Sequence, residues 1–138
     1  MFAARLRTAA PTRFPLNLLT IAAVLLGSST ALEAGHQPNR PTESQRRSGW
    51  KLLFDGKTTT GWRNYRKKTI GAGWKVQNGA LARAGRGAGD IVTVDQYEYF
   101  ELALEYKISK GGNSGIMFHV TEELGAPWQT GPEIQVQD

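Results

Sequence analysis

The sequence predicts an all-β protein, an antiparallel sandwich that follows a leader segment. Short stretches of alternating apolar and polar residues recur after position 49, and Gly, Asn or Asp turn residues separate them. No stretch of convincing length beyond residue 34 has apolar residues at helical spacing. The chain has no cysteine, so burial of apolar side chains must hold such a sandwich together.

Residues 1–34 have the features of a secretory signal peptide. Arg5, Arg7 and Arg13 precede an apolar run over residues 16–26, which then gives way to small residues. This order is typical of a signal peptide, and the run is too short to favour a membrane span. We therefore expect an exported protein, periplasmic or extracellular, that meets a membrane only if the signal segment stays uncleaved.

Residues 35–48 contain no apolar side chain, which predicts a disordered linker.

The chain carries 17 basic and 12 acidic side chains, and removal of the leader leaves only a mild basic excess. Four basic residues gather at Arg63, Arg66, Lys67 and Lys68, but without the aromatic pattern of a nucleic-acid groove. We interpret them as a solvated loop and expect no nucleic-acid partner.

The domain, residues 49–138, opens with two strand signals. Residues 50–54 alternate, and an Asp-Gly pair ends them with turn chemistry. Farther on, apolar residues alternate on both sides of Asn78 and Gly79. This pattern predicts a β-hairpin, because both turn positions tolerate positive φ.

The longest strand signal spans residues 100–108, after a shorter run at residues 90–94. Apolar and polar side chains alternate over nine positions, which predicts a strand with one buried and one polar face. The glycine-rich stretch 110–115 predicts a connecting loop, in which Asn113 is a turn residue.

Two further strands, residues 115–120 and 133–137, close the chain. In the last strand Glu133, Gln135 and Gln137 share one face, opposite two apolar residues that suit a core. The preceding strand places His119 on its more polar face in the same way. If the polar faces coincide, His119, Glu133 and Gln135 converge, and we regard them as a candidate site.

Four ordered segments carry a family resemblance: LFDGKTTTGW, WKVQNGALA, YEYFELALEYKISKGGNSGIMFHV and TGPEIQVQD. Residues 49–138 resemble the 3-keto-disaccharide hydrolase family. The resemblance implies a concanavalin-A-like jelly-roll sandwich, export in bacteria and a small carbohydrate substrate. Many relatives carry an arginine where this chain has His119, and the family domain continues past Asp138. We therefore expect an N-terminal fragment of the domain, with the sandwich incomplete at its C-terminus. The alternative is a small sandwich that is complete at this length.

The implied substrate determines the chemistry. A ketone at C3 of a sugar acidifies the hydrogen at C2, so a base can break the glycosidic bond by elimination, and water then adds. We assign the base to Glu133. His119 would serve as the acid or as an electrostatic partner, and Gln135 would hold sugar hydroxyls or the ketone oxygen.

Other residues are candidates for substrate contacts. Trp128, just before the last strand, could stack its ring on a sugar face, whereas Trp50, Trp62 and Trp74 are expected in the core. Gln137 lies on the same face as Glu133 and is a further candidate for substrate binding. For Asn113, sugar binding is the second interpretation, after a role in the turn.

Asp138 points away from Glu133 if the strand is regular, so we expect it to cap or support a turn. The sequence predicts no cofactor. A divalent metal held by His119, Glu133 and Asp138 stays an open alternative, although the spacing matches no recognised metal motif. The oligomeric state is not specified by the sequence.

Two other functions stay open. A non-catalytic, lectin-like carbohydrate-binding module uses the same sandwich class. A retaining glucanase on this fold ranks last, because the strand Glu-Ile-Gln-Val-Gln lacks the pair of carboxylates that retention needs.

Overall fold

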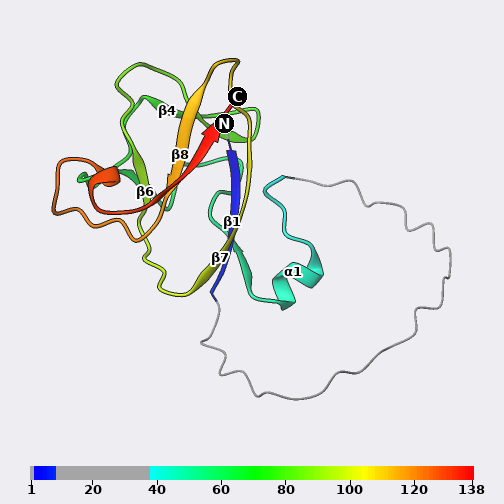
Figure 1. The fold of residues 1–138 in the computed structure, drawn as a ribbon. Coiled ribbons are helices and arrows are strands. Elements are labelled where there is room, and N and C mark those ends of the chain that lie inside the picture. The colour runs from blue at the N-terminus through cyan, green and yellow to red at the C-terminus, as the bar shows by residue number, and fades with distance from the viewer. Residues whose placement is uncertain (1, 9–37) are drawn as a thin grey trace.

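A computed structural model describes residues 2–8 and 38–138 of the chain (Figure 1). Strands dominate this part, and every pairing between them is antiparallel. The strands are β1 Phe2–Thr8, β2 Trp50–Leu52, β3 Trp62–Asn64, β4 Trp74–Gln77, β5 Ala80–Arg83, β6 Ile91–Thr93, β7 Phe100–Tyr106, β8 Asn113–Met117 and β9 Glu133–Gln137. The helices are α1 Glu43–Arg47 and the 3-10 turn η1 Pro127–Gln129. The predicted all-β, antiparallel sandwich class is confirmed.

The largest sheet is built around β1. One edge of β1 pairs with β7 along its whole length, from Phe2 opposite Tyr106 to Thr8 opposite Phe100. A strand has only two edges, so β2 and β5 share the other one. β4 then pairs with β5 at the far side of the sheet. Two smaller sheets, β3 with β6 and β8 with β9, complete the described strands.

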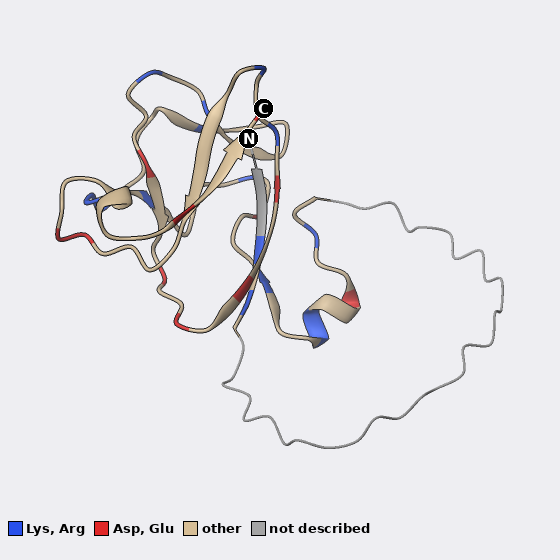
Figure 2. Cartoon of the chain, viewed as in Figure 1, with Lys and Arg blue, Asp and Glu red and all other residues tan. Residues whose placement is uncertain are grey.

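The side chains of β1 alternate between a buried apolar face and a charged face. Leu6 is 3% exposed and belongs to the core with Phe54 and Leu81. On the opposite face, Arg5 forms an ion pair with Glu105 of β7, and Arg7 does so with Glu101. Figure 2 shows basic positions on β1 beside acidic positions on β7. The alternation of β1 therefore fits both the apolar and the charged side of this sheet.

The prediction of a signal peptide falls mainly outside the described residues, including its apolar run over residues 16–26. Its basic start is described, and it forms β1, a strand that the sequence analysis did not predict. In residues 2–8 and 38–138, no helix is long and apolar enough to cross a membrane.

The prediction of a disordered linker over residues 35–48 is wrong for residues 43–47, which form α1. The helix begins with a capping box, in which the Thr42 hydroxyl accepts from the Gln45 N–H at 3.2 Å and the Gln45 side chain accepts from the Thr42 N–H at 2.9 Å. Glu43 in the first turn pairs with Arg46 and Arg47 in the last. These local interactions form a helix without any buried side chain.

The Asn-Gly hairpin is confirmed. β4 and β5 pair up to Gln77 opposite Ala80, and the two residues between them, Asn78 and Gly79, have φ of 50° and 73°.

The single buried face predicted for β7 is only partly correct. Leu102 and Tyr106 are 37% and 54% exposed, because neighbouring elements cover only part of this strand.

The sequence analysis did not predict β3, because its segment Trp-Arg-Asn has a single apolar side chain and therefore shows no alternation. Its last residue, Asn64, is the one buried polar side chain in the described part of the chain. The Asn64 amide donates to the carbonyls of Ala88 and Asp90 at 2.7 and 3.1 Å and accepts from the Gly71 N–H at 2.6 Å. These bonds fix the turn that follows β3 against the loop between β5 and β6.

Candidate active site

The candidate site lies on the β8–β9 pair. The register runs from Asn113 opposite Gln137 to Met117 opposite Glu133, so β8 lies nearer the N-terminus than the 115–120 that we expected. Directly opposite residues share a face of the sheet. The polar face therefore carries Asn113, Gly115 and Met117 of β8 and Gln137, Gln135 and Glu133 of β9.

Glu133 lies across its neighbouring strand. A Cβ atom built on Gly115 would overlap the side chain of Glu133, from its Cγ to its carboxylate. The missing side chain of Gly115 thus provides the space in which Glu133 rests. Because Glu133 is exposed, its carboxylate stays accessible from solvent in this position.

The amides extend this polar face along β9. The Gln137 Nε2 donates to the Gln135 Oε1 at 3.3 Å, and both side chains are exposed. Asn113 is the first residue of β8 and lies opposite Gln137. The residue with left-handed backbone geometry in the preceding turn is Gly111, with a φ of 66°. The turn role predicted for Asn113 is therefore wrong, since the glycine already supplies the required backbone.

Asp138 supports the connection between β7 and β8. Its Oδ2 accepts from the Gly111 N–H at 2.8 Å, and its own N–H donates to the Gly112 carbonyl at 3.3 Å. The expected supporting role is confirmed. Asp138 thus lies at the opposite end of the strand pair from Glu133, and no cluster of three potential metal-ligating residues occurs in the described ranges. The alternative in which His119, Glu133 and Asp138 together hold a metal therefore gains no support from the geometry.

His119 follows β8 and is not part of the strand. Its φ of 53° lies in the left-handed region, which breaks the alternation on which the predicted convergence depended. The His119 ring is exposed and meets the Phe118 ring edge-on, with centroids 5.4 Å apart. Across residues 2–8 and 38–138, no hydrogen bond or ion pair joins His119 to Glu133 or Gln135. The strand pair thus brings Glu133, Gln135 and Gln137 together, and the role of His119 stays a prediction.

The apolar side of β9 is covered at only one of its two positions. Val136 is 6% exposed and belongs to the core, as expected, whereas Ile134 is 58% exposed. The prediction of a fully core-facing side is therefore correct for the C-terminal half of β9 only.

The connection between β8 and β9 carries Trp128 in η1. Its ring is 63% exposed, as a stacking role requires. The other three tryptophans are half-buried. Trp62 and Trp74 donate their indole N–H groups to the carbonyls of Leu53 and Gly89 at 2.6 and 3.0 Å, so these rings have structural roles.

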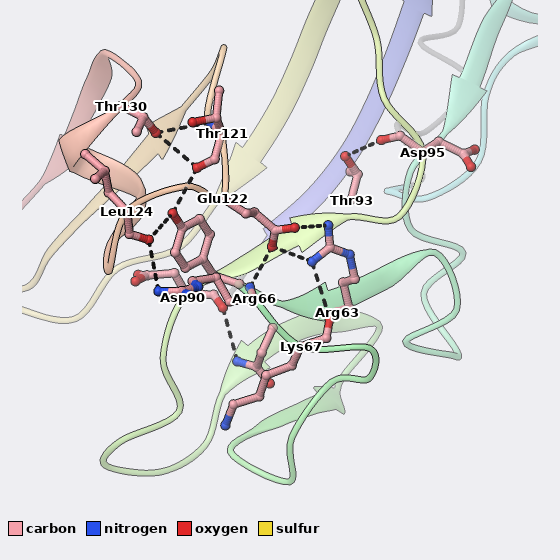
Figure 3. Close-up of polar contacts among 12 residues, drawn as sticks. Arg63, Arg66, Lys67, Asp90, Thr93, Asp95, Thr121, Glu122, Leu124 and Thr130 are labelled. Atoms are coloured by element: carbon pink, nitrogen blue, oxygen red, sulfur yellow. Dashed lines mark hydrogen bonds and ion pairs between the residues drawn. The ribbon is translucent and has the colours of Figure 1, made fainter.

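Two residues near β3 fix this connection. The Tyr65 hydroxyl lies 2.9 Å from the carbonyl oxygens of both Thr121 and Leu124 and can donate to either one (Figure 3). The Arg63 guanidinium donates through two nitrogens to the two oxygens of Glu122, at 2.6 and 2.9 Å. We call this set of contacts, made by Arg63 and Tyr65 to residues 121–124, the connection brace.

The brace also alters proton affinity. The hydrogen bonds from the Arg63 side chain and then from the Arg66 N–H lower the pKa of Glu122. The same bonds with Glu122 raise the pKa of Arg63. Sequence reasoning missed the brace, because its partners lie 56 to 59 residues apart in the sequence and no local pattern marks them.

Comparison with known proteins identifies related sequences. Residues 49–138 match the family model of the 3-keto-alpha-glucoside-1,2-lyase-like domain. A protein of Bacteroides thetaiotaomicron described as a 3-keto-disaccharide hydrolase is 35% identical over an alignment of 94 positions, which covers 62% of this chain and 32% of that protein. The chain thus spans about a third of this curated relative.

A solved structure agrees with the family. A Parabacteroides distasonis protein described as a glycosyl hydrolase shares 36% sequence identity with the chain at a TM-score of 0.59. The alignment covers 72% of this chain and 46% of that protein. Since the family model matches well over half of the sequence, the chain belongs to the family of 3-keto-alpha-glucoside-1,2-lyase-like domains.

Proposed function

We propose that this domain cleaves glycosides whose sugar carries a ketone at C3, by elimination followed by hydration. The family match over residues 49–138 carries the proposal. The family is described as a 1,2-lyase-like domain and the curated relative as a hydrolase. Elimination of the substituent at C1 followed by addition of water accounts for both descriptions.

The proposed reaction has three steps. A base removes the proton at C2, and the electrons of that C–H bond form an enolate whose negative charge rests on the ketone oxygen. The enolate then reforms the ketone, a C1–C2 double bond appears, and the C1–O bond breaks as the leaving oxygen takes a proton. Water finally adds across the double bond, which gives the products of hydrolysis.

Glu133 is the proposed base. It is the one carboxylate among the six residues on the polar face of the β8–β9 pair, and solvent reaches it. Gln135 lies two positions along the same face and would donate its amide hydrogens to the ketone oxygen as charge develops there. His119 is the proposed donor of a proton to the leaving group, from the turn directly after β8.

Further contacts would hold the sugar. The exposed ring of Trp128 offers an apolar face for stacking, and the amides of Gln137 and Asn113 offer hydrogen-bond partners for hydroxyl groups. The lone carboxylate on this face argues against a retaining glucanase, which needs two. A concanavalin-A-like jelly-roll topology and export from the cell are part of the proposal, as expected from the sequence.

The test compares a ketone substrate with its parent sugar. The full chain should release glucose from 3-keto-trehalose and leave trehalose intact, as followed by product chromatography. Equal cleavage of both sugars would overturn the proposal. Binding of 3-keto-trehalose without any turnover would replace it with the carbohydrate-binding module.

A further inference from the structure

Outside the proposed active site, four basic side chains surround an open pocket of about 490 Å³. The pocket is lined by Arg63 from β3, by Arg66, Lys67 and Lys68 from the turn that follows, and by Glu122 from the β8–β9 connection. We call this the basic pocket. It joins two segments that lie far apart in the sequence (Figure 3).

The single carboxylate of the basic pocket is already engaged. Both oxygens of Glu122 accept from Arg63, and one of them also accepts from the Arg66 N–H at 2.6 Å. Arg63 in turn donates to the Lys67 carbonyl at 3.3 Å. Glu122 therefore neutralises Arg63 and leaves the other three cations in excess.

The backbone holds these three cations next to one another. Arg66 has a φ of 58°, and its N–H bond to Glu122 stabilises this left-handed conformation. Its guanidinium makes only a long bond, 3.4 Å, to the Leu124 carbonyl and retains further donors. Arg66, Lys67 and Lys68 all have exposed side chains. Three like charges carried on one turn repel one another, and a bound anion relieves that repulsion.

We propose that the basic pocket is a subsite for an anionic group carried by a sugar, such as a carboxylate or a phosphate. The Arg66 guanidinium supplies a planar pair of donors for the anion, and the two lysines supply mobile point charges.

The subsite extends the proposed function. It depends on that proposal for one point only, that the ligand is a carbohydrate. The connection that provides Glu122 also carries Trp128 and leads into β9 with Glu133. A substrate with an acidic unit would thus be bound next to the connection that leads to the proposed base.

The experiment measures binding without turnover, so it is independent of the cleavage reaction. The full chain is titrated with glucuronate, glucose 6-phosphate, glucose and inorganic phosphate by calorimetry. We expect at least one of the charged sugars to bind about tenfold more tightly than glucose and than inorganic phosphate, which corresponds to about 1.4 kcal/mol. The Lys67→Gln/Lys68→Gln variant should lose this preference, whereas Lys57→Gln/Lys110→Gln, with the same change of charge outside the pocket, should keep it.

Three results would overturn the subsite. The first is that neither charged sugar binds more tightly than glucose. The second is that inorganic phosphate binds as tightly as the charged sugars, which would show that the basic pocket attracts an adventitious ion only. The third is an equal loss of binding in both double variants, which would indicate attraction by net charge. Because Lys67 and Lys68 are exposed, their replacement leaves the connection brace in place.

Discussion

Arg63 and Glu122, 59 residues apart in the sequence, form a two-point ion pair with N–O distances of 2.6 and 2.9 Å. The pair links β3 to the connection that carries Trp128. Both side chains are partly exposed, at 21% and 37%, so solvent screens the pair. Its main consequence is therefore the position of the connection, with a modest gain in stability.

Glu122→Gln should lower the free energy of unfolding by about 1 kcal/mol, because the two-point ion pair is lost. The lowered pKa of Glu122 gives this difference a pH dependence. The contribution is full above the usual pKa of 4.5 and is lost as the pH falls through the lower pKa of the folded state. Urea unfolding between pH 3 and pH 7 measures it. Glu123→Gln, at the exposed neighbouring position, is the control, and an equal effect of both variants would contradict the brace.

Gly115→Ala should displace Glu133, because the new methyl group occupies the space of its side chain. We expect the cleavage of 3-keto-trehalose to fall at least about tenfold while the protein stays folded. The effect on stability should disappear in a Glu133→Ala background, where the methyl group meets no side chain. A double-mutant cycle of unfolding free energies measures this coupling, and purely additive effects would show that the two residues do not interact.

Trp128→Ala should lower the kcat/KM for the ketone substrate about tenfold, as the loss of one aromatic stacking contact predicts. The melting temperature should hardly change, since the ring is 63% exposed. Tyr99→Ala, which removes an aromatic ring that is 53% exposed elsewhere, is the matched control. An equal loss of activity in the control would remove Trp128 from the substrate site.

Reversal of charge on β7, by Glu101→Arg and Glu105→Arg together, should destabilise the fold by about 1–2 kcal/mol, since two cross-strand pairs become repulsive. The reciprocal reversal of Arg5 and Arg7 on β1 should restore most of this loss. Thermal unfolding of the full chain measures both changes. If the reciprocal variant stays as unstable as the first, β1 does not pair with β7 in solution.

Local patterns made much of the fold predictable. The Asn-Gly hairpin and the alternation of Glu133, Gln135 and Gln137 depend on neighbours in the sequence, and both predictions are confirmed. The capping box that begins α1 at Thr42 was also present in the sequence, but the polar composition around it predicted a linker instead.

Long-range contacts could not be predicted. The pairing of β1 with β7 and the bond of Tyr65 to the connection join segments that no local pattern relates. The conformation of His119 could not be predicted either, because the alternation of apolar and polar residues does not indicate a positive φ at a non-glycine residue. The part of the site that depends on strand periodicity was therefore predictable, and the part beyond the end of β8 was not.

The central claim, that Glu133 removes the proton at C2 of a 3-keto sugar, has a direct test. Methyl 3-keto-α-glucoside is incubated with the full chain in D₂O, and NMR follows the C2 hydrogen and the release of methanol. We expect cleavage with deuterium entering at C2, and a loss of at least about a hundredfold in rate for Glu133→Gln, the effect of removing a general base. Rates within twofold for the two proteins, or cleavage without any deuterium at C2, would contradict the account.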